Sequence, residues 1–210
     1  VKWDDKLKRL VKAGEKLVKG DYEVVSMYRP FTKKYLYYYS PIIHRQGKYE
    51  GMPKNNRMIY VTGPSARREF SALMIENIPD AHLMDTGQAY SILNLSNEGG
   101  LLNFEKDINE VYIDKLNLSN AQELIYYVYG VLHSKDYKKR FANDLLKGAP
   151  RIPLLKNQKQ YIEIGQRLSD LHLNYENIEP YSGVVIKSTE KPSYKVNKMR
   201  HPKKGVLDKI

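Results

Sequence analysis

Basic and aromatic side chains cluster over residues 28–35, which read Tyr-Arg-Pro-Phe-Thr-Lys-Lys-Tyr. Pro30 favours a tight turn between two expected strands, so the cations would lie around the turn. A turn of this size can enter a groove of duplex DNA, where arginine can bond guanine O6 and N7 and lysine can bind phosphate. Arg29, Lys33 and Lys34 are therefore candidate DNA-binding residues. For Arg29, a structural salt bridge beside core aromatic rings is an equally good interpretation.

Two further basic stretches are candidates for contact with phosphate. Arg67 and Arg68 follow the loop sequence Gly63-Pro64-Ser65, and seven lysines and arginines between residues 187 and 208 accompany only two acidic residues. An extended strand over residues 194–200 would place alternate cations on one side. A solvated charged surface is the alternative interpretation of both stretches. The predicted DNA contacts here are Arg67, Arg68, Lys195, Lys198 and Arg200.

Motifs for nucleotide, methyl-donor or metal chemistry are missing from the sequence. It has neither a Gly-x-x-x-x-Gly-Lys-Ser/Thr loop, nor Gly-x-Gly-x-x-Gly, nor the Asn-Pro-Pro-Tyr type of sequence that holds a flipped adenine. Pro79-Asp80 could begin a nuclease motif, but no acidic-x-Lys partner follows on a convincing strand, and no two histidines have zinc-ligand spacing. His133 and His172, at the ends of apolar helical stripes, are expected to bond the last carbonyls or pack in the core. We expect no catalytic, cofactor-binding or metal-binding residue. A hydrolase without a recognisable active-site motif is a third possible function, after DNA recognition and docking between domains.

The composition favours nucleic acid as the partner class. The 210 residues carry a formal net charge of +11 with a pI near 9.5, and 18 tyrosines outnumber four phenylalanines and one tryptophan. Positive charge attracts polyanions over a Debye length of about 8 Å, and tyrosine rings can stack on bases. An AT-rich genome would give a similar composition, so this observation alone is ambiguous. The sequence has no cysteine, no bilayer-length apolar run and no signal peptide, which fits a reducing cytoplasm.

Hydrophobic periodicity predicts an N-terminal helix followed by a β-rich segment. Apolar residues between Asp4 and Lys19 have helical spacing, and Gly20 suits the position just after a helix C-terminus. Gly and Pro breaks separate the strand patterns that follow. The expected strands are residues 22–28, 34–39, 57–62, 71–75 and 90–95.

The rest of the sequence predicts an acidic loop, a helical insert and a returning β segment. Residues 98–114 contain five acidic residues and one lysine, so they should point away from DNA. Ser119, Ser134 and Asn157 are the predicted N-caps of three helices, the second ending at Gly148. The elements predict an α/β or α+β domain with a mixed sheet, about three inserted helices and a β-like C-terminal segment at residues 184–187 and 194–199. The expected divisions are 1–97, 98–118, 119–176 and 177–210.

Five stretches of the sequence, taken together and in order, carry a resemblance to a known family. They are Tyr-Arg-Pro-Phe at 28–31 with Tyr-Leu-Tyr-Tyr at 35–38, and residues 125–134, 137–143, 150–153 and 168–176. In this order they resemble the C-terminal target recognition domain of bacterial Type ISP restriction-modification enzymes, often labelled helicases. Thr32 stands where that family usually has Asp. The resemblance therefore gives less support for a salt bridge between this position and Arg29. Residues 91–95 replace a more aromatic strand, which suggests a local change in the recognition lobe.

The resemblance implies a module that reads the sequence of double-stranded DNA within one large polypeptide. A nuclease, a helicase-like ATPase and an N6-adenine methyltransferase would lie upstream, with ATP, Mg²⁺ and S-adenosylmethionine bound there and no cofactor in this segment. We expect the chain to be a piece of such a protein that ends before the recognition domain is complete. Its partners would be DNA and the upstream methyltransferase and helicase-like domains, with no membrane.

Docking between domains is the main alternative function. The chain would then couple the methyltransferase to the motor without reading bases, and its positive charge would balance an acidic partner. Residues 98–114 and the helical insert would form that interface.

Overall fold

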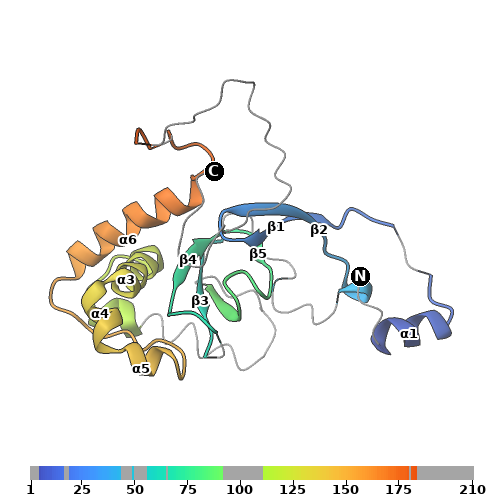
Figure 1. The fold of residues 1–210 in the computed structure, drawn as a ribbon, viewed down its shortest axis with the longest axis horizontal. Helices are drawn as coiled ribbons and strands as arrows, with labels where there is room; N and C mark the ends of the chain where they lie inside the picture. Colours follow the sequence, from blue (N-terminus) through green and yellow to red (C-terminus); the bar gives the residue numbers. More distant parts are fainter. Residues whose placement is uncertain are drawn as a thin grey trace, which may run out of the picture. The chain divides into compact units, whose positions relative to one another are not determined.

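The computed structural model describes residues 5–16, 19–43, 49, 56–64, 66–91, 111–179 and 181–183. The chain divides into two compact units, Val1–Asn177 and Ile178–Ile210, and nearly all described residues belong to the first. Figure 1 shows helices and strands in that first unit, which gives the predicted α+β content. The strands predicted at 184–187 and 194–199 lie outside the described residues. None of the described helices combines the length and apolar character needed to cross a bilayer.

Helix α1 (Asp5–Lys12) ends earlier than the sequence pattern predicted. Gly14 has a φ of +72°, a conformation that glycine adopts without steric cost. The N–H of Glu15 then donates to the carbonyl of Leu10 (3.1 Å), as in a Schellman motif that terminates a helix. The prediction that Gly20 terminates this helix was therefore wrong, because an earlier glycine already satisfies the last carbonyls.

The first sheet is mixed and contains the hairpin predicted around Pro30. It has the strand order β2-β1-β5, where β1 (Glu23–Arg29) pairs antiparallel with β2 (Thr32–Tyr37) and parallel with β5 (Ile78–Pro79). The register shifts between Met27 and Arg29, which introduces an irregularity just before the turn. Strand β5 lies outside the predicted strands, at one of the proline breaks between them. A short 3₁₀ helix, η1 (Ser40–Ile42), follows the hairpin.

The second sheet is antiparallel, with the order β4-β3-β6. Its strands are β3 (Met58–Thr62), β4 (Ala72–Ile75) and β6 (Gly87–Ser91), so the strands predicted at 57–62 and 71–75 are confirmed within a residue. Strand β6 begins three residues before the predicted start at 90, and residues 92–95 of that prediction lie outside the described part. The strands thus form two three-stranded sheets where the sequence predicted a single one.

The helical layer follows the predicted order with two differences. Asn120, one residue after the predicted Ser119, caps α3 (Ala121–His133) by accepting from the N–H of Glu123 at 2.9 Å. Ser134 caps the next helix as predicted, but that helix is divided at Phe141. Asn157 precedes the last helix without a side-chain capping bond. The remaining helical elements are residues 111–115, α4 (Lys135–Arg140), α5 (Ala142–Leu145) and α6 (Gln158–Leu173).

Strands β3 and β4 are buried on both faces, so the second sheet lies between two layers (Figure 1). Because side chains alternate along a strand, successive residues enter different cores. Ile59, Val61, Ala72 and Met74 pack with buried side chains of α3. Met58, Tyr60, Leu73 and Ile75 pack on the other face with Met27 of β1 and Leu83. The sheet therefore links the helical layer to the hairpin.

Helices α3 and α6 approach each other closely at two glycines. A Cβ atom at Gly130 would overlap the carbonyl of Tyr161, and a Cβ at Gly165 would overlap the carbonyl of Tyr126. No side chain larger than hydrogen fits between these two backbones, so the glycines set the distance between the helices.

Tyr129 of α3 joins the second sheet to α6 through its hydroxyl. This hydroxyl accepts a hydrogen bond from the N–H of Met74 in β4 (2.9 Å) and is also hydrogen-bonded to Nδ1 of His172 in α6. The ring of His172 in turn contacts Phe31 at the hairpin turn, edge to face at 5.6 Å. His133 packs on the Tyr129 ring at 4.6 Å. The interpretation of both histidines as packing residues is confirmed.

We expect Gly165→Ala to destabilise the protein by about 1–3 kcal/mol, because the added methyl group must push two helix backbones apart. The gain in helix propensity, up to about 1 kcal/mol, is too small to offset this cost. Urea unfolding followed by circular dichroism measures the difference. Gly148→Ala is the matched control, since nothing lies within 4 Å of its added Cβ, and an equal effect of both substitutions would contradict the packing argument.

Acid should weaken the fold through His133. Burial lowers the pKa of His133 to about 4, and nearby Lys138 and His172 act in the same direction. Between the ordinary pKa of 6.5 and about 4 the unfolded chain binds a proton that the folded chain does not, so the free energy of unfolding decreases as the pH falls through this range. We expect His133→Leu to lose less stability than the wild type between about pH 7 and about pH 5 in urea titrations. Parallel pH profiles would argue against this role.

Candidate nucleic-acid interface

The candidate interface is built on the turn of residues 80–86, which connects β5 to β6. Leu83 anchors this turn in the core with only 1% of its surface exposed. The hydroxyl of Tyr60 donates to one carbonyl of the turn (3.3 Å), and the N–H of Gly63 donates to another (2.8 Å). At the start of the turn, the N–H of Asp80 donates to the carbonyl of Met27 (2.9 Å). The backbone of the turn is therefore fixed at both ends and in the middle.

The first carboxylate of the turn, Asp80, holds Arg29. Its Oδ1 accepts from Nη1 of Arg29 (2.9 Å) and from the N–H of His82 (2.9 Å). Nη1 also donates to the carbonyl of Tyr28 (2.6 Å), and the guanidinium lies 4.1 Å from the centre of the Tyr28 ring. The salt-bridge interpretation of Arg29 is thus what the structure shows. No described residue bonds Nε or Nη2, so that edge can still donate to a ligand, and 41% of the side chain is exposed.

The second carboxylate of the turn, Asp85, holds Arg67. Its Oδ2 accepts from the backbone N–H (2.7 Å) and Nε (3.3 Å) of Arg67, and its Oδ1 accepts from Nη2 (3.2 Å). Hydrogen bonds from Arg67 hold the pKa of the Asp85 carboxyl below its usual value, so the carboxylate is charged at neutral pH. The Asp85 side chain is 14% exposed, whereas that of Arg67 is 88% exposed.

A groove of about 740 Å³ brings three of the predicted DNA-binding residues together. Arg29, Arg67 and Arg68 line it, along with residues of the 80–86 turn and Glu69. Arg68 is exposed and has no ion-pair partner among the described residues. The groove therefore combines two arginines fixed by carboxylates with one that is free to move.

The two hairpin lysines point to different surroundings, as adjacent strand residues must. Nζ of Lys34 lies 4.0 Å from the centre of the same Tyr28 ring that contacts Arg29, so Lys34 extends the positive charge beside the groove. Lys33 instead pairs with Glu176 (2.6 Å), and this hydrogen bond raises the pKa of Lys33. Lys33 is thus not brought together with the arginines.

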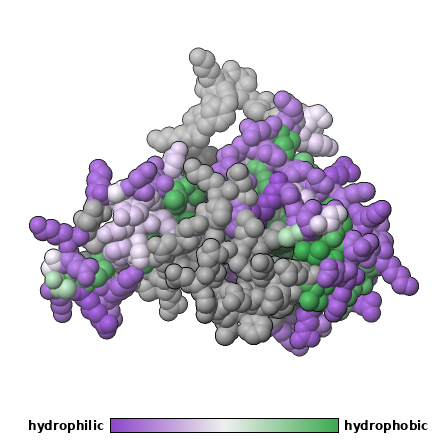
Figure 2. Space-filling view, turned by 180° about the vertical axis from the view of Figure 1, so that it is seen from behind, coloured by the Kyte–Doolittle hydropathy of each residue, from purple (hydrophilic) through white to green (hydrophobic). Residues whose placement is uncertain are grey.

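Lys195, Lys198 and Arg200 lie outside the described residues, as do residues 98–110 of the acidic stretch. The sequence reasoning missed Tyr28 and Asp85 as site residues and considered Asp80 only as a possible start of a nuclease motif. Within the described residues no three His, Asp or Glu side chains are grouped so that they could hold a metal ion. Figure 2 shows a mainly hydrophilic described surface on one face of the molecule, with smaller apolar areas between.

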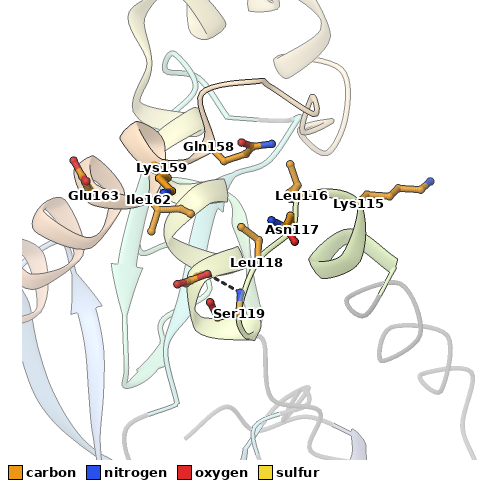
Figure 3. A pocket seen from close by; sticks show the side chains of 10 residues that line it. Lys115, Leu116, Asn117, Leu118, Ser119, Gln158, Lys159, Ile162 and Glu163 are labelled. Carbon is orange, nitrogen blue, oxygen red and sulfur yellow. Dashed lines mark hydrogen bonds between the residues drawn. The ribbon is translucent and has the colours of Figure 1, made fainter.

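A second cavity, of about 580 Å³, lies where the N-terminal turns of α3 and α6 meet residues 115–119 (Figure 3). Lys115 and Lys159 line it together with Glu123 and Glu163. Oε2 of Glu123 already accepts from a backbone N–H, that of Ser119, at 2.8 Å. Because acidic and basic side chains balance there, this cavity is less suited to a polyanion than the arginine groove.

Comparison with known proteins identifies the class as specificity domains of restriction-modification enzymes. The family described as Type ISP C-terminal specificity domain matches residues 1–210, and the chain belongs to this family. The resemblance stated from the sequence is therefore confirmed. No curated protein sequence matches the chain.

Two solved structures of Type ISP enzymes are similar to the whole chain. One is a nuclease-deletion mutant of LlaGI in complex with a DNA substrate mimic, with 38% identity and a TM-score of 0.78 over 99% of this chain and 16% of that one. The other is the ATP-dependent enzyme LlaBIII bound to DNA, with 33% identity and a TM-score of 0.80 over 99% and 15%. The chain thus spans under a fifth of either enzyme. A DrdV–DNA complex shares the fold at 21% identity, with a TM-score of 0.73 over 86% of this chain and 19% of that one.

Burial of Leu83, more than the ion pairs, should hold the turn in place. Leu83→Ala is expected to cost about 2–5 kcal/mol of unfolding free energy, as for other buried leucines. Asp80→Asn keeps an oxygen that can accept from the N–H of His82 and should cost less than about 1 kcal/mol, because partly exposed ion pairs contribute little. Thermal and urea unfolding compare the two variants, and a reversed order would show that electrostatics holds the turn.

Proposed function

We propose that this chain recognises a specific sequence in double-stranded DNA as the specificity module of a Type ISP restriction enzyme. The observation that carries this proposal is the groove that gathers Arg29, Arg67 and Arg68, with Lys34 beside it. Family membership supports the same conclusion, as do the DNA complexes of LlaGI and LlaBIII. In the complete protein, a nuclease, a helicase-like ATPase and an N6-adenine methyltransferase would use ATP, Mg²⁺ and S-adenosylmethionine outside this chain.

The cations of the interface are suited to different tasks. Lys34 and Arg68 lie on the surface without an acidic partner among the described residues, so they can follow phosphates at little cost. Arg29 is fixed by Asp80 and retains an unbonded donor edge, which suits a directed contact in the groove. Lys33 must first leave Glu176, so its contribution to affinity should be smaller than that of Lys34. Lys195, Lys198 and Arg200 remain further proposed contacts.

The dependence of DNA affinity on salt tests the proposed phosphate contacts. Each lost phosphate contact lowers the slope of log affinity against log salt by about 0.9, so Lys34→Ala with Arg68→Ala should lower it by about 1.8. Fluorescence anisotropy with a labelled duplex measures this slope. The matched control is Lys139→Ala with Arg167→Ala, which removes two exposed cations of α4 and α6 that do not line the groove.

Two outcomes would count against the proposal. Equal slopes for both double variants would mean that the groove has no special role. Absence of duplex binding, together with binding to the purified upstream domains, would favour the docking function instead.

A further inference from the structure

We infer that Arg67 reads a guanine of the target site and that Asp85 is its positioning residue. This inference rests on the proposed function, since it requires duplex DNA in the arginine groove. It adds the chemical identity of one base in the target and names the pair of residues that recognises it.

The hydrogen bonds of Arg67 leave one bidentate edge free. A guanidinium has five N–H donors, and Asp85 accepts from Nε and from Nη2. Of the three remaining donors, two lie on Nη1 and one on Nη2, so the end of the guanidinium can still donate two parallel hydrogen bonds. Guanine presents O6 and N7 in the major groove as two neighbouring acceptors, which match this geometry.

The surroundings of Asp85 indicate that it positions the side chain of Arg67 and does not merely neutralise its charge. Its side chain is largely covered, while the side chain of Arg67 that it holds is almost fully exposed. The carboxylate also accepts from the backbone N–H of Arg67, so it holds both the backbone and the guanidinium of this residue. Asp85 itself has a φ of +74°, a conformation that is uncommon outside glycine and that the anchored turn maintains. A long exposed side chain is thereby ordered before any ligand arrives, which lowers the entropic cost of binding.

The other two arginines of the groove are less suited to this task. Arg68 has no carboxylate partner among the described residues, so its guanidinium can rotate freely and fits a phosphate contact better. Arg29 is held by Asp80, but its side chain is less exposed than that of Arg67 and its guanidinium lies over the Tyr28 ring.

The experiment selects bound sequences from a random duplex library with the 210-residue chain and with three variants. Arg67→Lys keeps the charge but removes the planar fork. Asp85→Asn removes the negative charge, and asparagine tolerates a positive φ, so the turn should stay folded. Arg167→Lys, at an exposed arginine of α6, is the matched control. Thermal unfolding verifies that every variant is folded.

We expect the wild type and Arg167→Lys to select the same site, with guanine fixed at one position. Arg67→Lys and Asp85→Asn should lose discrimination at that position alone, by about 5- to 150-fold, the range of one bidentate base contact. Placing 7-deazaguanine there, which lacks the N7 acceptor, should weaken the wild type and leave Arg67→Lys nearly unaffected.

Three results would overturn the inference. Uniform loss of affinity at all positions would make Arg67 a phosphate contact, and unchanged selection would remove it from the interface. Binding of duplex without sequence preference would refute base reading by Arg67 while leaving DNA binding intact. If the wild type binds no duplex at all, the proposed function itself fails, and this result is distinct from the other three.

Discussion

Burial of Leu83 is the interaction on which the geometry of the interface depends. The side chain packs against the face of the second sheet that carries Tyr60 and Ile75, and it fixes the short turn that contains Asp80 and Asp85. Each carboxylate then holds an arginine from a different part of the chain. Exposed ion pairs contribute little stability, but here they determine where two flexible cationic side chains lie. Burial of Leu83 thus fixes the turn, and the two ion pairs made by the turn then determine where the arginine charges lie.

Strands β3 and β4 of the second sheet connect the interface to the helical layer, because both faces of these two strands are buried. One face packs on the helices and the other on β1 and the turn. The hairpin is also held at its turn, where Phe31 packs against His172 of α6 and against Tyr175. Arg29 therefore lies on a segment that is supported from two sides. The helices contribute no arginine to the groove, yet they limit how the hairpin that carries Arg29 can move.

Local patterns in the sequence predicted much of the fold. Apolar β-rich stretches located β3 and β4, and polar residues before apolar stripes located the helix starts to within one or two residues. The end of the N-terminal helix was predicted at Gly20, whereas the positive φ of Gly14 and the hydrogen bonds around it end the helix earlier. The sequence did not indicate that three arginines line one groove, because this arrangement depends on contacts between residues that are distant in the sequence. Asp80 meets Arg29 across 51 positions, and Glu176 meets Lys33 across 143. No periodicity encodes such pairings.

The close crossing of α3 and α6 has a consequence for how this family can change its target. Both backbones are already in contact at Gly130 and Gly165, so the helical layer cannot adapt by exchanging side chains at the crossing. The exposed positions of residues 66–71 and of the turn of residues 80–86 carry no such restriction. Under the proposed function, exchanging these two segments together on an unchanged helical frame would change the DNA preference, whereas substitutions at the helix crossing would unfold the protein before they altered selectivity.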